Sequence, residues 1–116
     1  AENALTHIRT HADADGYPVF EARTLAARGK ALLVLGRTRE AIDDLNAAET
    51  RMRRLHSPDS PWLLDVLAAL SLAHRQQKDF PRAQVLLNQA RAIARRNPSL
   101  PALFLMRLEL AQRPPV

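Results

Sequence analysis

The sequence contains no cysteine, and its 116 residues include only three glycines, three phenylalanines, one tryptophan and one tyrosine. The absence of cysteine excludes a disulfide framework, a zinc site built on thiolates and a cysteine nucleophile. Because aromatic residues are scarce, the core must be built from leucine and alanine, which suits closely packed helices. No apolar run approaches the roughly 20 residues of a membrane-spanning helix.

Charge is distributed unevenly along the chain. Residues 1–65 carry nine basic and ten acidic side chains, a net charge of −1, whereas residues 66–116 carry eight and two, a net charge of +6. Arginine outnumbers lysine by 15 to 2, a bias typical of G+C-rich bacterial coding. Because the chain starts at Ala1, we expect either a fragment of a larger bacterial protein, in the cytoplasm, or a mature periplasmic chain that has lost its leader.

The strongest positive feature is an internal repeat with a spacing of 42 residues. When residues 22–57 are laid over residues 64–99, 11 of the 36 pairs are identical, among them Leu25/Leu67, Ala41/Ala83, Leu45/Leu87, Ala48/Ala90 and Arg53/Arg95. A fixed period of a few tens of residues is typical of stacked-repeat proteins, which present a surface. The repeat therefore favours a binding protein over an enzyme.

Proline, glycine and capping residues divide the chain into six predicted helices and no strands. We expect helices over residues 1–13, 19–35, 39–55, 61–77, 80–96 and 100–112, with caps at Thr38, Ser60 and Asp79. Loops this short make successive helices antiparallel neighbours. The prediction is one all-α domain over residues 1–116, in which 1–13 ends a preceding unit, 19–56 and 61–97 are two units, and 100–112 is the first or capping helix of another.

Small residues at fixed places in each unit resemble the tetratricopeptide repeat family. The first copy supplies Leu25, Gly29, Leu32, Gly36, Ala41, Leu45 and Ala48, and the second supplies Leu67, Ser71, Phe80, Ala83, Leu87 and Ala90. The second copy departs from the pattern at Ser71, His74 and Lys78. The family period is usually 34, so this unit is similar to the longer ones of kinesin light chains and bacterial regulators. The resemblance implies a right-handed α-α superhelix of about six helices.

The same resemblance implies that the first helix of each unit lines a groove that binds proteins or peptides. Carried over by position, the groove residues are Arg23, Ala26, Ala27, Lys30, Leu33, Val34, Asp65, Ala68, Ala69, Leu72, Arg75 and Gln76. We expect Arg23, Lys30 and Arg75 to meet an acidic peptide. The asparagines of the subgroup that grips chaperone tails are absent.

Arginines also cluster near the ends of the two second helices. Stacking would place them side by side as a basic ridge made of Arg51, Arg53, Arg54, Arg91, Arg95 and Arg96. Such a ridge could attract phosphates in a salt-dependent way. The alternative is that cations at helix C-termini stabilise the helices, and we favour this structural role because interleaved aromatic residues are missing.

Candidate catalytic and metal-binding residues are few. His7 and His11 have the spacing of metal ligands on a helix, but we interpret them as a solvated face. We interpret His74 as a packing residue, and Asp43 and Asp44 as a solvated face because neighbours on a helix point about 100° apart. No phosphate-binding or nucleophile motif occurs. We therefore expect no catalytic residues, cofactor or metal.

The sequence thus predicts a non-catalytic scaffold that binds a protein or peptide, with self-association through its terminal repeats as a further partner interaction. The alternative is a helical-repeat regulatory region of a transcriptional regulator or kinase, with nucleic-acid contact through the arginine ridge. Both of these functions would depend on exposed side chains that bind another molecule. We expect binding to nucleic acid to be the less favoured of the two, and no membrane contact.

Overall fold

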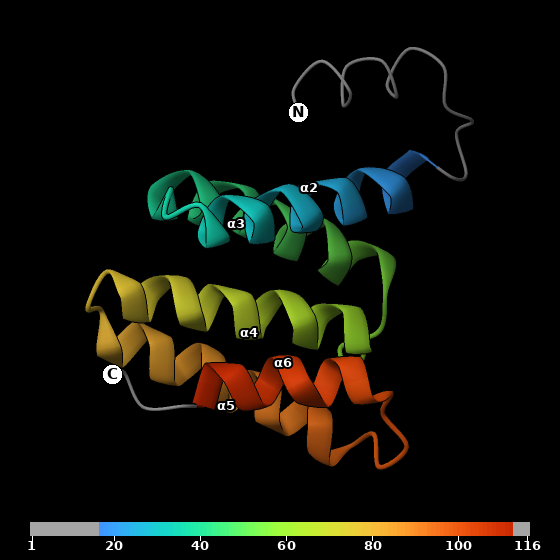
Figure 1. Ribbon diagram of the computed structural model, residues 1–116. Coiled ribbons are helices and arrows are strands. Elements are labelled where there is room, and N and C mark those ends of the chain that lie inside the picture. Colours follow the sequence, from blue (N-terminus) through green and yellow to red (C-terminus); the bar gives the residue numbers. More distant parts are fainter. Residues whose placement is uncertain (1–16, 113–116) are drawn as a thin grey trace.

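The computed structural model describes residues 17–112, and all regular structure in that range is α-helical. The helices are α2 (Tyr17–Val34), α3 (Thr38–Leu55), α4 (Pro61–Gln76), α5 (Phe80–Arg95) and α6 (Ala102–Gln112). Figure 1 shows α2 and α3 as one hairpin stacked on a second hairpin of α4 and α5, with α6 beside α4. The predicted all-α fold of stacked hairpins is confirmed. The helix expected over residues 1–13 lies outside the described residues.

Helices α4 and α5 begin where the sequence predicts, because proline and a capping side chain act together at each start. The Ser60 hydroxyl accepts a hydrogen bond from the backbone N–H of Trp62 (3.2 Å), and the Asp79 carboxylate accepts one from Arg82 (3.3 Å). Each helix has a proline in its first turn, where no N–H is needed inside the helix. These contacts fix the boundaries of the second hairpin.

Two predicted helix starts differ from the structure. Thr38 is the first residue of α3, and the cap position belongs to Arg37, which makes no side-chain cap hydrogen bond. The last helix begins at Ala102 instead of Leu100. The reason for the later start is Pro101, since a proline disfavours helical backbone at the residue before it.

The two helices of the first hairpin approach closely at Gly29. A Cβ atom at this position would lie 2.7 Å from Cγ of Leu45, so a larger residue would force the helices apart. The corresponding position of the second hairpin holds Ser71, whose hydroxyl donates a hydrogen bond to the carbonyl oxygen of Ala83 (2.8 Å). Both hairpins thus need a small residue at the crossing, as the family pattern implies.

The turns of the two hairpins share an unusual backbone conformation. Gly36 has φ of 80° and Lys78, 42 positions later, has φ of 64°. Glycine adopts this left-handed region without cost, whereas a residue with a Cβ atom loses roughly 1 kcal/mol or more there. The second turn therefore keeps the shape of the first with a less suitable residue.

The core is centred on α4. Ten of its residues are buried, because α3 and α5 cover it on two sides and α6 covers a third. Packing at the two ends of the stack is unequal: against the first hairpin, α4 packs chiefly on α3, whereas against the second hairpin, α6 packs chiefly on α4 and less on α5. The last helix therefore does not repeat the placement that α4 has on the first hairpin.

Candidate functional site

One acidic side chain on α4 joins the three helices α2, α4 and α6. Asp65 on α4 is only 5% exposed, and its carboxylate accepts hydrogen bonds from Nζ of Lys30 (2.7 Å) and Nε of Arg107 (3.0 Å). These partners lie on α2 and α6. The surface around this contact is called the first-helix face below. Its centre holds one negative charge between two positive charges.

A cation and two aromatic rings form a second contact across the same face. The guanidinium of Arg23 on α2 lies 4.5 Å from the ring centroid of Trp62 on α4, within the distance of a cation–π interaction. The Trp62 ring also meets Phe104 of α6 edge to face, with centroids 5.4 Å apart. Trp62 stays 37% exposed and Phe20 is 55% exposed. Both remain accessible to a partner.

The residues predicted to line a groove differ widely in exposure. Ala27 is exposed and Val34 is 87% exposed, whereas Ala69 is fully buried. Leu72 is half-buried against the core, and the exposed Gln76 accepts a hydrogen bond from Thr38 (3.0 Å). The accessible part of the predicted groove is therefore on α2 and at the end of α4, because α3, α5 and α6 enclose the middle of α4.

The three cations expected to meet an acidic peptide are not brought together. Lys30 is bound to Asp65, and Arg23 lies over Trp62. Arg75 instead lines a cavity of about 130 Å³ bounded by α4, α5 and the end of α6. Two of these charges already have partners within the fold, so the face is less positive than the sequence alone predicts.

Sequence reasoning missed Phe20, Trp62 and Arg107 as residues of this face. The signal was present, since Phe20, Trp62 and Phe104 are 42 positions apart, as are Arg23, Asp65 and Arg107. Carrying the 42-residue spacing on through α2, α4 and α6 would have found both rows. The contacts inside the rows could not be found this way, because a spacing says nothing about which side chains pair.

The first-unit arginines of the predicted ridge lie at the end of α3, and two of them contact α2 or α5. Nε of Arg51 donates to Oε1 of Glu21 (2.6 Å). Arg54 lies beside Arg51 in the wall of a cavity of about 470 Å³. Arg53 is paired with Glu49 (2.8 Å) and also reaches Gln89 on α5 (3.4 Å).

The second-unit arginines of the ridge spread in different directions. Arg91 donates to Gln112 of α6 (3.0 Å), and Nε of Arg96 donates to Asp59 in the loop before α4. Arg95 is exposed. The structure brings Arg53 and Arg96 into the wall of one cavity. Contact of the ridge with nucleic acid stays a prediction.

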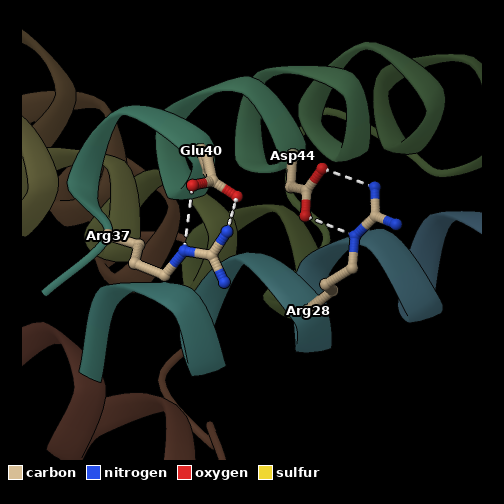
Figure 2. Close-up of polar contacts among 4 residues, drawn as sticks. All are labelled: Arg28, Arg37, Glu40 and Asp44. Atoms are coloured by element: carbon tan, nitrogen blue, oxygen red, sulfur yellow. Dashed lines mark hydrogen bonds and ion pairs between the residues drawn. The ribbon is translucent and has the colours of Figure 1, made fainter. Parts of the chain in front are cut away.

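Two further ion pairs lie in the first hairpin, as Figure 2 shows. Nε and the terminal nitrogen of Arg28 donate to both carboxylate oxygens of Asp44 (2.6 and 2.7 Å). Arg37 makes the same two-pronged contact with Glu40 at the start of α3 (2.9 and 2.6 Å). The interpretation of Asp44 as part of a solvated face is wrong, because this side chain is buried and faces α2. Asp43 is exposed.

Comparison with known proteins connects this geometry to a family. The family model described as tetratricopeptide repeat matches residues 20–96, which span α2 to α5. The chain belongs to the tetratricopeptide repeat family. Repeats of this family mediate contacts between proteins and are typically non-catalytic. No curated protein and no solved structure matched the chain.

The titratable groups of this tetratricopeptide repeat chain include one histidine with a shifted pKa. Burial lowers the pKa of His74 below its ordinary 6.5, Arg82 lowers it further, and Asp79, 4.0 Å away, raises it. Within residues 17–112, no cluster of three or more metal-ligating side chains occurs. Across the same range, the helices are too short or too polar to cross a membrane. His7 and His11 lie outside the described residues.

Proposed function

We propose that this chain is a non-catalytic protein-interaction module whose first-helix face binds an extended segment of a partner protein. The observation that carries the proposal is the placement of Arg23 over Trp62, on two neighbouring first helices. Phe20 lies three positions before Arg23 and so shares its side of α2. A charged group and two accessible rings therefore lie together on the face that the family uses for contacts.

The chemistry of the face indicates what the partner segment carries. Phe20 and Trp62 offer apolar area to an aliphatic or aromatic side chain, and the edge of the Arg23 guanidinium is suited to a carboxylate. Asp65 holds the charges of Lys30 and Arg107. We therefore infer a segment with an apolar anchor and one nearby acidic group, instead of the long acidic run that three free cations would favour.

Selection from a displayed random-peptide library, followed by fluorescence polarisation with the selected peptide, tests the proposal. Arg23→Glu places a carboxylate against the acidic group of the ligand and is expected to weaken binding about tenfold or more. Arg39→Glu changes the same charge at an exposed position of α3 and serves as the matched control. Equal affinity of the two variants would overturn the assignment of binding to this face.

Replacing Asp65 by asparagine sharpens the test. The change leaves the charges of Lys30 and Arg107 without their carboxylate, so the face becomes more positive. Affinity for a peptide with an added acidic residue is expected to rise, and circular dichroism checks that the helices remain. Lower affinity with an intact helical spectrum would show that Asp65 itself contacts the ligand, contrary to the proposal.

Self-association is the second part of the proposed partner chemistry. Leu105, Met106 and Leu110 of α6 are 48%, 60% and 42% exposed, and an exposed terminal helix can stack on another copy. Sedimentation velocity over a range of concentrations is expected to show a dimer that Met106→Glu disperses. A monomer at all concentrations would exclude this contact. That the chain belongs to a larger bacterial protein remains an expectation from the sequence.

A further inference from the structure

One side of α6 is apolar and exposed, and the repeat shows what covers the same side elsewhere. The exposed residues on it are Leu105, Met106 and Leu110. Each lies 42 positions after a buried residue of α4 and 84 positions after a buried residue of α2; these residues are Leu63, Leu64 and Ala68, and Glu21, Ala22 and Ala26. The same side of the helix is therefore buried in both hairpins and exposed on α6.

In the first hairpin, the second helix covers this side. Among the described residues, α2 packs chiefly on α3, and Glu21 accepts a hydrogen bond from Arg51 of α3 (2.6 Å). Ala22 lies seven residues before Gly29, so it is about two turns away on the same side of α2, and Gly29 is the point where α2 and α3 approach closely. The exposed side of α6 is thus the side on which a second helix packs.

Residues 1–13 have the apolar pattern of a second helix. Their apolar residues recur at helical spacing and lie 40 positions before buried residues of α3: Ala1, Leu5, Ile8 and Ala12 precede Ala41, Leu45, Ala48 and Met52. The segment lies outside the described residues. Its sequence offers the kind of apolar row that covers α2 in the first hairpin.

The other end of the stack, at α2, also has an uncovered side. Ala31 of α2 is exposed, whereas Ala73 of α4, 42 positions later, is fully buried. The first hairpin covers Ala73, which clusters with Leu33 of α2 and Ala41 of α3. Within residues 17–112, no helix covers Ala31 in this way. A further unit placed before α2 would bury it.

We propose that copies of this chain associate head to tail, with α6 of one copy and residues 1–13 of the next copy forming one shared unit. The inference rests on the self-association in the proposed function and names the other half of that contact. The row of Leu5 and Ile8 packs on the exposed side of α6. The shared unit then lies on α2 of the second copy as the first hairpin lies on α4.

This contact joins two different surfaces, so it does not close on itself. A dimer is therefore the first member of a series that grows with concentration. A contact between two α6 helices would use the same surface twice and would stop at the dimer. The two arrangements differ in how blocked variants combine.

Two full-length variants, each blocked at one end, separate these arrangements. Met106→Glu and Ile8→Glu each bring a charge into the apolar contact, where an unpaired charge is costly. Each variant alone is expected to sediment as a monomer at a concentration where the unchanged chain associates. An equimolar mixture is expected to sediment as a dimer and as nothing larger, because each dimer has one intact contact and two blocked ends.

The outcomes distinguish this inference from the proposed function. Dimers of Ile8→Glu alone, or a mixture that stays monomeric, would overturn the shared unit and leave self-association through α6 standing. An unchanged chain that is monomeric at every concentration would overturn both. Arg23 and Trp62 are unchanged in every variant, so peptide binding at the first-helix face reports separately on the rest of the proposed function.

Val85→Glu is the matched control for Met106→Glu. Val85 is exposed on α5, and Asp43, 42 positions earlier, is exposed on α3 although the second hairpin packs beside that helix. The position therefore lies outside the contact between units. Association is expected to be unchanged in Val85→Glu, and circular dichroism checks that each variant keeps its helices. Loss of association in this variant would reduce the effect to net charge and overturn the site.

Cysteine cross-linking gives a second measurement. The chain has no cysteine, so one introduced thiol reports one position. Counted two turns from the crossing of Gly29 and Leu45, the positions expected to lie opposite each other in the shared unit are Met106 and Ala12. Chains with Met106→Cys and with Ala12→Cys, mixed in oxidised glutathione, are expected to form mainly the mixed dimer. A random distribution of the three possible dimers would overturn the shared unit.

Discussion

The two hairpins use different chemistry in corresponding places. Arg28 and Asp44 form a two-pronged ion pair between α2 and α3. The residues 42 positions later are Leu70 and Leu86, which lie in the main core between α4 and α5. One hairpin is joined by charges where the other is joined by apolar packing.

A second pair repeats the difference. Glu21 and Arg51 join α2 to the end of α3, and the residues 42 positions later are Leu63 and Ile93, both buried. Within residues 17–112, fewer helices cover the first hairpin than the second, and the arginines of its ion pairs are partly exposed to water. The second hairpin is covered by α6 and its interior is apolar. The two helices of a hairpin can thus be joined by ion pairs or by apolar side chains. Which of the two occurs follows from how many neighbouring helices cover the hairpin.

Truncating the central leucine should give the largest difference between the hairpins. Leu45 is fully buried against Gly29, whereas Leu87 lines the open cavity of about 130 Å³. Leu45→Ala is expected to lower the free energy of unfolding by about 3–4 kcal/mol, and Leu87→Ala by about 2–3 kcal/mol because part of its surroundings is already empty. Urea denaturation followed by circular dichroism measures both. A larger loss for Leu87→Ala would contradict the account of the two cores.

Converting the charged hairpin into the apolar one tests the comparison directly. Asp44→Leu alone leaves Arg28 without its carboxylate and is expected to cost about 1–3 kcal/mol. Arg28→Leu combined with Asp44→Leu copies Leu70 and Leu86, and is expected to restore or exceed the original stability. Thermal unfolding of the two variants gives the comparison. If the double variant is less stable than the single one, the apolar solution is not available to the first hairpin.

The turns should respond in opposite directions. Lys78→Gly is expected to stabilise the chain by roughly 1 kcal/mol, because glycine relieves the left-handed backbone. Gly36→Ala is expected to destabilise it by a similar amount, about 1 kcal/mol, and no atom lies within 4 Å of the added Cβ, so the backbone alone is tested. Urea midpoints of the two variants measure the effect. Movement of both in the same direction would refute the equivalence of the turns.

The smallest expected effect is a pH dependence confined to the second hairpin. The lowered pKa of His74 means that the unfolded chain binds a proton more readily than the folded one as the pH falls through about 6.5. Stability from this residue is therefore present above that pH and declines below it. His74→Leu, which copies Leu32 of the first hairpin, is expected to flatten this part of the pH profile of unfolding. An unchanged profile would exclude His74 as its source.

Much of the fold follows from local signals in the sequence. Ser60 with Pro61, and Asp79 with Pro81, mark the starts of α4 and α5 because capping and proline chemistry act within a few residues. The later start of α6 also has a local cause in Pro101, which the prediction did not weigh. Contacts between residues that lie far apart in the sequence were harder to predict. Asp65 meets Lys30 and Arg107 from positions 35 and 42 residues away, and only the stacking of helices brings them together.

The candidate surfaces stay predictions. The repeat identifies equivalent arginines, but it does not identify their partners, because Glu21, Asp59 and Gln112 come from other elements. The predicted groove includes Ala69, which the fold buries, since the prediction carried positions over without asking which helix covers them. Whether a side chain is exposed depends on the helices that pack around it. The 42-residue spacing shows only which positions are equivalent in the two units.

The central claim is that α2 and α4 together form the surface on which this chain binds a partner protein. Titration of isotopically labelled chain with the peptide selected from a random library, followed by amide chemical shifts, tests it most directly. The account predicts shifts at Phe20, Arg23, Ala27 and Trp62, with the rest of the chain little changed. Saturable binding that leaves all four amides unchanged would contradict it.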